Sequence, residues 1–271
     1  MKRDIIALFS AFSLLRVDRE TGAIDHRVVI SMMRLAALLL AFLLAVSARA
    51  GEIVFESKPA RTHLLELFTS EGCSSCLPAE AWLSNLKNEP RLWQDFVPVA
   101  FHVDYWDHLG WRDPFASKTW TERQADYSAR WKQETVYTPA FVLDGKEWHY
   151  GVVPAAATET PGVLKITIDG ERITALFKPA TNSGRHYEVH VARLGFARSA
   201  DVTAGENSGR KLMHDFVVLG LTNEEIKAGV KELKLPAESS PPVANSRSAI
   251  AAWATQAGQI EPIQVVGGWL Q

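Results

Sequence analysis

The sequence predicts an α/β domain followed by an all-β, sandwich-like domain, and three observations support this division. Residues 61–150 alternate short apolar runs with segments of helical spacing. After Pro161 the pattern changes to strand pairs joined by short turns. With 271 residues and 47% hydrophobic content, the chain can bury one large core or two modest ones. We therefore expect domains at 51–160 and 161–271.

The segment before the first domain carries a secretory signal pattern. Residues 32–50, "MMRLAALLLAFLLAVSARA", hold one arginine, an apolar stretch and a small-residue cleavage site. A membrane anchor or a buried helix is the alternative, although the apolar core is short for a membrane span. The charged break "RVDRETGAIDHR" precedes this segment, so residues 1–31 are expected to be a gene-model extension. Cleavage after Ala50 predicts an exported, periplasmic or secreted protein with no stable membrane insertion.

The charge distribution excludes one class of partner. The formal net charge is −2 and is spread without long basic or acidic runs. A chain of this kind lacks the basic surface that binds a phosphate backbone. We expect no nucleic-acid partner.

The first elements of the α/β domain surround the only two cysteines. "THLLELF", residues 62–68, has the length and apolar character of a strand, and "TSEG" is a turn cluster. "LPAEAWLSNLKN", residues 77–88, has mostly helical spacing, with Pro78 in the first turn. This order places Cys73 at the N-terminus of a helix and Cys76 one turn inside it.

The cysteine pair has three possible roles: a reactive dithiol, a structural crosslink or a metal clip. Export would permit a disulfide. A crosslink over so short a loop stabilises the fold by less than roughly 2 kcal/mol, which argues against a purely structural role. A helix N-terminus lowers a thiol pKa, so Cys73 would exchange with a partner and Cys76 would release it. Glu71 and Glu80 flank the pair and oppose thiolate formation.

Two further segments complete the predicted first domain. "FVPVAFHVDYW", residues 96–106, is a strand candidate, and residues 138–150 predict a hairpin that turns at Asp144-Gly145. The polar, tryptophan-rich segment between them is partly helical.

Several motifs resemble one secreted family. "ELFTSEGCSSC", "FHVDYWDHLGWRDPF", "ERQADY" and "VYTPAFVLDG" are similar to the thioredoxin-like family catalogued as domain of unknown function 1223. The resemblance implies a thioredoxin-like fold in which Pro139 is cis beside the disulfide and Thr138 offers its backbone to an extended substrate. It also implies a buried carboxylate as proton acceptor, for which Glu66 is the candidate; a solvent-facing strand glutamate is the alternative.

A metal site is a competing interpretation of "HVDYWDHLGW". His102, Asp104, Asp107 and His108 are ligand types, and a thiolate and histidine set could bind copper or zinc. Two cysteines supply only two ligands, so we favour packing and rim hydrogen bonds and expect no metal. The nearby tryptophans, of which Trp106 is the first, are interpreted as packing or as a wall of a substrate groove.

The C-terminal half predicts strands and no catalytic constellation. Strand candidates lie at 163–178, 187–194, 211–221, 249–256 and 262–270. Residues 222–234 fit either a helix with a capping box or a strand. "GENSGR" is interpreted as a turn, and the spacing of His186, His190 and His214 is that of ordinary strand residues.

These observations favour a thiol-disulfide oxidoreductase that acts on protein or small-molecule thiols or disulfides without a cofactor. A redox-inert binding or assembly module and a metal carrier are the alternatives. The direction of electron flow is left open by the sequence.

Overall fold

A computed structural model describes residues 30–31, 51–149, 151–181, 186–226, 229–239 and 246–270. The expected extension at 1–31 and signal segment at 32–50 lie outside the described residues, apart from Ile30 and Ser31. From Glu52 on, the chain forms one compact unit. Within the described ranges, no helix has both the length and the apolar character needed to cross a lipid bilayer.

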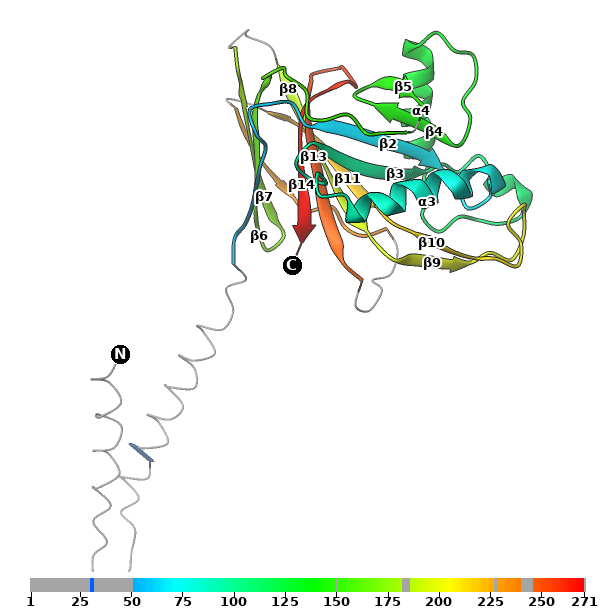
Figure 1. Ribbon diagram of the computed structural model, residues 1–271. Coiled ribbons are helices and arrows are strands. Elements are labelled where there is room, and N and C mark those ends of the chain that lie inside the picture. The colour runs from blue at the N-terminus through cyan, green and yellow to red at the C-terminus, as the bar shows by residue number, and fades with distance from the viewer. Residues whose placement is uncertain are drawn as a thin grey trace, which may run out of the picture. The chain divides into compact units, whose positions relative to one another are not determined.

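Strands dominate this unit (Figure 1). The strands are β1 (Ile53–Glu56), β2 (His63–Thr69), β3 (Phe96–His102), β4 (Ala140–Leu143), β5 (Lys146–Trp148), β6 (Gly162–Asp169), β7 (Arg172–Pro179), β8 (Tyr187–Gly195), β9 (Arg198–Asp201), β10 (Lys211–His214), β11 (Val217–Ile226), β12 (Val230–Lys234), β13 (Ser248–Gln256) and β14 (Pro262–Leu270). The described helices from residue 51 on are the 3₁₀ turns η2 (Ser74–Cys76), η3 (Leu86–Asn88) and η4 (Asp107–Leu109) and the α-helices α3 (Leu77–Asn85) and α4 (Lys118–Arg130).

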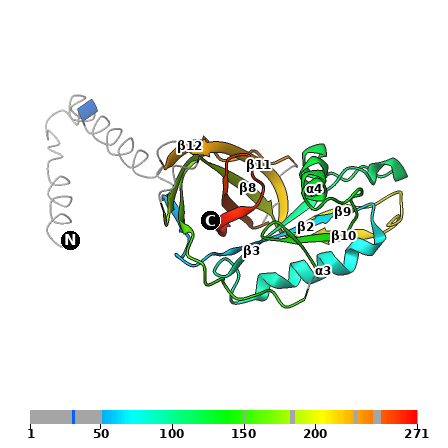
Figure 2. The ribbon, with the colours of Figure 1, turned by 90° about the horizontal axis from the view of Figure 1, so that it is seen from above.

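The strands form three sheets. The largest has eight strands in the order β14-β13-β8-β11-β3-β2-β4-β5, with β3 parallel to both β2 and β11 and the other pairs antiparallel. A four-stranded antiparallel sheet has the order β1-β6-β7-β12, and β9 pairs with β10. The four-stranded sheet curves against β8, β13 and β14 (Figure 2).

The expected fold class, a thioredoxin-like α/β domain with a separate all-β domain, is wrong. Strands from both halves of the chain join in one mixed sheet, because β11 pairs with β3 as well as with β8. The link between β11 and β3 is one parallel residue pair, Val217 with Ala100, supported by the Ala100 N–H donating to the carbonyl of Phe216. Sequence periodicity identifies a strand but carries no information about its partner strand, so it did not reveal this mixed sheet.

Local predictions fared better. The predicted turn at Asp144-Gly145 joins β4 and β5, and both residues have positive φ, as a two-residue hairpin turn of this type requires. The undecided segment 222–234 is strand in its described parts: it continues β11 and then forms β12. A capping box is a local signal that tertiary pairing overrides here.

The two α-helices cover opposite faces of β2 and β3 (Figure 2). Alternate β2 residues face each helix: Thr69 bonds to α3, and Glu66 bonds to α4. Helix α4 begins after Ser117, whose hydroxyl accepts from the Thr119 N–H. The sheet therefore has a buried polar contact on each face.

A single glutamine ties the first and last parts of this unit together. Gln264 of β14 is 0% exposed, and its side-chain oxygen accepts from the Thr62 N–H. Its amide nitrogen donates to the carbonyls of Lys58, Ala60 and Gly162. Because each polar atom of this buried side chain has a partner, it fixes the approach to β2.

Candidate functional site

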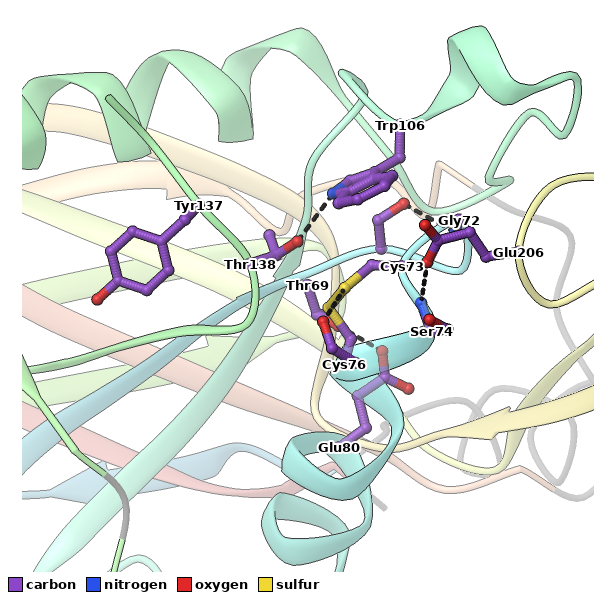
Figure 3. The surroundings of a disulfide bond; sticks show 12 residues. Thr69, Gly72, Cys73, Ser74, Cys76, Glu80, Trp106, Tyr137, Thr138 and Glu206 are labelled. Atoms are coloured by element: carbon purple, nitrogen blue, oxygen red, sulfur yellow. Dashed lines mark hydrogen bonds between the residues drawn. A yellow bond between two sulfur atoms is a disulfide. The ribbon is translucent and has the colours of Figure 1, made fainter. Parts of the chain in front are cut away.

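The cysteines lie just after β2, where the chain turns into η2 and then α3. They form a disulfide with Cα atoms 5.4 Å apart, and both side chains are 0% exposed (Figure 3). Turn η2 separates Cys73 from α3, so Cys73 precedes the α-helix by a turn, and Cys76 caps it. Pro78 lies in the first turn of α3, as predicted, where its missing N–H is tolerated.

The Trp106 side chain covers the turn that carries Cys73 (Figure 3). A Cβ atom on Gly72 would lie 2.7 Å from the Cβ of Trp106, closer than real atoms approach, so only glycine fits. The indole Nε1 donates to the Thr138 hydroxyl over 2.8 Å. The Trp106 side chain that covers the disulfide is therefore held by packing on Gly72 at its Cβ and by the hydrogen bond to Thr138 at its indole nitrogen.

The Thr138-Pro139 segment leads into β4 and lies next to Trp106. Its peptide bond is cis. Both residues are half-buried, and Tyr137 before them is 42% exposed. The structure places Thr138 in contact with the tryptophan cover.

A loop from the C-terminal half reaches the cysteine turn. Glu206 accepts the backbone N–H of Ser74 over 2.9 Å, and hydrogen bonds from Ser74 lower the pKa of the Glu206 carboxyl. Asn207 donates to the backbone carbonyl of Glu71. The segment "GENSGR" is a turn, as predicted, and it supports the disulfide loop.

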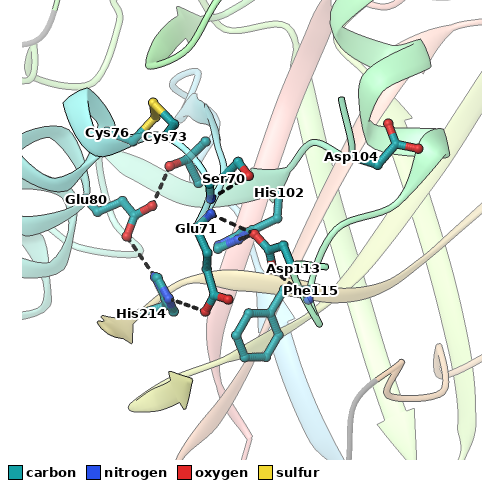
Figure 4. Close-up of polar contacts among 12 residues, drawn as sticks. Ser70, Glu71, Cys73, Cys76, Glu80, His102, Asp104, Asp113, Phe115 and His214 are labelled. Carbon is teal, nitrogen blue, oxygen red and sulfur yellow. Dashed lines mark hydrogen bonds and ion pairs between the residues drawn. A yellow bond between two sulfur atoms is a disulfide. The ribbon is translucent and has the colours of Figure 1, made fainter. Parts of the chain in front are cut away.

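A buried polar ladder runs inward from the disulfide (Figure 4). The Thr69 hydroxyl donates to Glu80 of α3. Glu80 also contacts Nδ1 of His214 at 2.7 Å, and Nε2 of that ring lies 2.8 Å from Glu71. Each of these residues is at most 8% exposed.

The ladder controls the charge of His214. Burial alone would lower the pKa of this imidazole, but the charge of Glu80 and the hydrogen bonds to Glu71 and Glu80 raise it to about 10. The imidazolium form is therefore the resting form near neutral pH, with a carboxylate at each ring nitrogen.

A second histidine and carboxylate pair lies against the first. Nδ1 of His102 is 2.7 Å from Asp113, and the two histidine rings meet edge to face at 5.0 Å between centroids. Burial would raise the pKa of Asp113, but the charge and hydrogen bond of His102 hold it below its usual value. The opposite ring nitrogen of His102, Nε2, is buried without a hydrogen-bond partner.

Glu66, the predicted proton acceptor, is 0% exposed, so it does not face solvent. It lies on the α4 side of the sheet, where it accepts from the Tyr127 hydroxyl at 2.5 Å and from Arg123 at 2.7 Å. Burial opposes the charge of Arg123, but the carboxylate raises the Arg123 pKa above its usual value. A permanent cation thus neutralises Glu66.

The other residues of the metal interpretation bond to other groups. Asp104 accepts from the Thr121 hydroxyl, Asp107 accepts from the backbone N–H of Asp113, and exposed His108 contacts the carbonyl of Tyr105. Trp120 packs on Phe101, as the packing interpretation predicts.

Sequence reasoning missed the partners that complete the site. His214 and Asp113 carried no signal, because the histidine is separated from Glu80 by 134 positions and the aspartate lies in a polar loop. Glu71 and Glu80 were expected to act as repulsive charges near the thiols, whereas the structure pairs both with His214. Together these groups can hold and exchange protons beside a reducible bond.

Two solved structures resemble the chain. An X-ray structure of a protein from Agrobacterium tumefaciens aligns with a TM-score of 0.55 and 24% identity, covering 79% of this chain and 96% of that one. HBP35 of Porphyromonas gingivalis aligns with a TM-score of 0.50 and 12% identity, covering 79% of this chain and 76% of that one. At these identities the likeness concerns the fold alone. No curated protein matches the sequence.

A family model matches most of the sequence. The model described as "Protein of unknown function (DUF1223)" matches residues 64–254. This span contains the disulfide, the tryptophan cover, His102, His214 and the Glu206 loop. The chain therefore belongs to the DUF1223 family.

Proposed function

We propose that this protein is a thiol-disulfide oxidoreductase that uses the Cys73–Cys76 pair. The observation that carries the proposal is a disulfide closed over two intervening residues at the start of a helix. In the loop-entropy model such a crosslink stabilises the fold by only about 2 kcal/mol, so its value to the fold is small. Its surroundings are nevertheless elaborate: a tryptophan cover, a supporting carboxylate and a buried acid-base ladder.

The exchange reaction assigns different roles to the two sulfurs. A partner thiolate attacks Cys73 Sγ, the Cys73–Cys76 bond breaks, and Cys76 leaves as a thiolate that takes up a proton. Cys76 then attacks the mixed disulfide in the reverse direction, or a second partner thiol resolves it and leaves the pair reduced. Cys73 is the outer sulfur in this scheme because it is flanked by exposed Ser74 and accompanied by the Ser75 hydroxyl at 3.3 Å.

Partner binding must uncover the pair. Both cysteines are fully buried, so a thiolate reaches Cys73 only after Trp106 or the serine turn moves. We assign partner recognition to the half-buried Thr138-Pro139 segment, with exposed Tyr137 beside it. A protein or small thiol that replaces the Trp106 hydrogen bond at Thr138 would open the cover as it binds.

Export is part of this proposal. An oxidised pair persists outside the reducing cytoplasm, and the signal pattern at residues 32–50 supplies a route. Intact mass of the protein recovered from the exported fraction tests this: a chain that begins at Gly51 supports export with cleavage, and a retained apolar segment contradicts it.

The exchange itself is tested by trapping. The Cys76→Ser variant, incubated with a small disulfide such as oxidised glutathione, should accumulate a mixed disulfide at Cys73. The Cys73→Ser variant should accumulate far less. Adducts on Cys73→Ser alone would reverse the roles, and a wild-type pair that stays oxidised across a full glutathione redox series would overturn the proposal.

The burial of both sulfurs favours one alternative, a redox-inert module whose disulfide only shapes the loop. The two functions differ in a measurable way. For an oxidoreductase the disulfide is reduced at a finite rate in the folded protein, whereas for an inert module reduction follows global unfolding. Comparing the reduction rate with the unfolding rate under the same conditions separates them.

A further inference from the structure

The buried cluster below the disulfide contains a small cavity with metal-ligating groups on its wall. Glu80, His102 and His214 each offer one ligand atom, and these atoms lie within 4.8 Å of one another. The three side chains line a cavity of about 10 Å³. This is close to the smallest space that holds one water molecule or one ion.

His102 is prepared as a ligand. Asp113 occupies its Nδ1 position at 2.7 Å, so in the neutral ring that donates to Asp113 the free electron pair is on Nε2. Nε2 has no hydrogen-bond partner although the residue is 1% exposed. A buried polar atom without a partner costs free energy unless something pairs with it. A histidine whose other nitrogen donates to a carboxylate is the usual arrangement around bound metal ions.

His214 also has a supporting carboxylate, but both of its ring nitrogens are paired. Its Nε2 contacts Glu71 at 2.8 Å, which leaves Nδ1 directed at Glu80, 2.7 Å away. A cation between Nδ1 and Glu80 would take the place of the ring proton that now joins them. Glu71 would then support His214 as Asp113 supports His102.

We propose that Glu80, His102 and His214 bind one divalent transition-metal ion, Zn²⁺ in the first instance. Two imidazole nitrogens and one carboxylate oxygen form a zinc ligand set that leaves a fourth position open. Zinc bonds of about 2.0–2.1 Å place tetrahedral ligand atoms about 3.3 Å apart. The widest present separation, up to 4.8 Å, must therefore contract, and the 2.7 Å between His214 Nδ1 and Glu80 must widen. The site excludes both cysteines and does not depend on the proposed thiol chemistry.

The proposed ligands differ from those that the sequence suggested. On sequence alone, the two cysteines are combined with His102, Asp104, Asp107 and His108, and no metal is favoured because two cysteines supply only two ligands. The actual neighbours of His102 come from α3 and β10, far away in sequence.

Titration of the oxidised, chelator-treated protein tests the site. Isothermal titration with Zn²⁺ should show one equivalent bound, and Co²⁺ as a probe should give the visible absorption of a four-coordinate site.

His102→Ala should weaken binding at least a hundredfold, whereas the control His108→Ala, an exposed histidine nearby, should leave it unchanged. Asp113→Asn should weaken it about 10- to 100-fold and shift the Co²⁺ spectrum, because Asp113 orients the ligand.

A variant-free measurement guards against misfolded mutants. Zinc X-ray absorption of the wild-type complex should show two imidazoles and oxygen, with no sulfur. Sulfur ligation, no bound equivalent, or equal affinity in His102→Ala and His108→Ala would overturn the proposal. Binding that survives in the Cys73→Ser, Cys76→Ser double variant would support it.

Discussion

The two faces of β2 and β3 each bury an ionic network, and the networks differ in the kind of positive charge they contain. On the α4 face, Glu66 is held by the guanidinium of Arg123 and by Tyr127. On the α3 face, Glu71 and Glu80 are held by the imidazole of His214. A guanidinium keeps its proton at any pH a protein tolerates, whereas an imidazole can exchange its proton.

This difference supports a structural role for the α4 network, whereas the proposed thiol and metal chemistry involves the α3 network. Arg123 also lies over the rings of Phe101, Tyr127 and Trp253. Ring packing and the ion pair with Glu66 therefore both hold the guanidinium in position. The α3 network lies below the disulfide and includes a histidine nitrogen with no partner. The disulfide lies over the network in which the positive charge is carried by an imidazole.

The largest expected effect is on the α4 face. Arg123→Ala leaves the fully buried Glu66 without its cation and should lower the free energy of unfolding by about 3–5 kcal/mol. Urea denaturation measures this. Lys118→Ala on the same helix is the control: it removes an exposed ion pair with Glu122 and should change stability by less than about 1 kcal/mol. Equal effects would show that the α4 network is not structural.

The next effect belongs to the α3 face. Zn²⁺ at 100 times its dissociation constant should raise the free energy of unfolding by about 2.7 kcal/mol, because it binds only the folded protein. Glu80→Gln should abolish this gain, and Glu122→Gln, an exposed glutamate of α4, should keep it. A gain that survives in Glu80→Gln would place the ion elsewhere.

A third comparison uses pH and His190, on the α4 face near Arg123. Burial and then the charge of Arg123 lower the His190 pKa to about 3. Below pH 6.5 this histidine is therefore protonated in the unfolded chain but stays neutral in the folded protein until the pH approaches 3. Stability should therefore fall as pH decreases from 6.5 toward 3, by at most about 1.4 kcal/mol per pH unit. His190→Gln should flatten this slope, and His186→Gln, an exposed control, should not.

The smallest effect on stability concerns the tryptophan cover. Trp106→Phe keeps an aromatic ring but loses the hydrogen bond to Thr138, which should cost about 1 kcal/mol and speed reduction of the disulfide by dithiothreitol several-fold. Trp111→Phe loses an indole hydrogen bond to Glu71 and should cost a similar amount. If both variants are reduced at the same rate, Trp106 does not limit access to the sulfurs.

Local features of this fold could be predicted, because their causes are local. Strands β6 and β7 alternate buried and less buried residues, and the turn between them is at Gly170, which has positive φ. The sheet order could not be predicted, because a single pair, Val217 with Ala100, joins the two halves of the large sheet. One residue pair leaves no periodic pattern in the sequence.

The site divides in the same way. Cys73 and Cys76 were identifiable because their chemistry depends on a spacing of three residues. His214 was assigned to an ordinary strand, since the sequence of β10 gives no sign that its ring meets Glu71 and Glu80. The sequence also left undecided whether Glu66 is buried, because a glutamate in a strand pattern normally faces water.

The Gln264 side chain has a consequence for the order in which the protein is made. The backbone that leads into β2 is bonded to an amide in the final strand, some 200 positions later in the chain. A growing polypeptide emerges N-terminus first, so Thr62 and Lys58 leave the ribosome long before their partner exists. The backbone before β2 therefore gains these hydrogen bonds only after β14 has been made. A nascent or truncated chain that stops before Pro262 is expected to lack the Gln264 bonds that hold the segment leading into β2 and the cysteine turn.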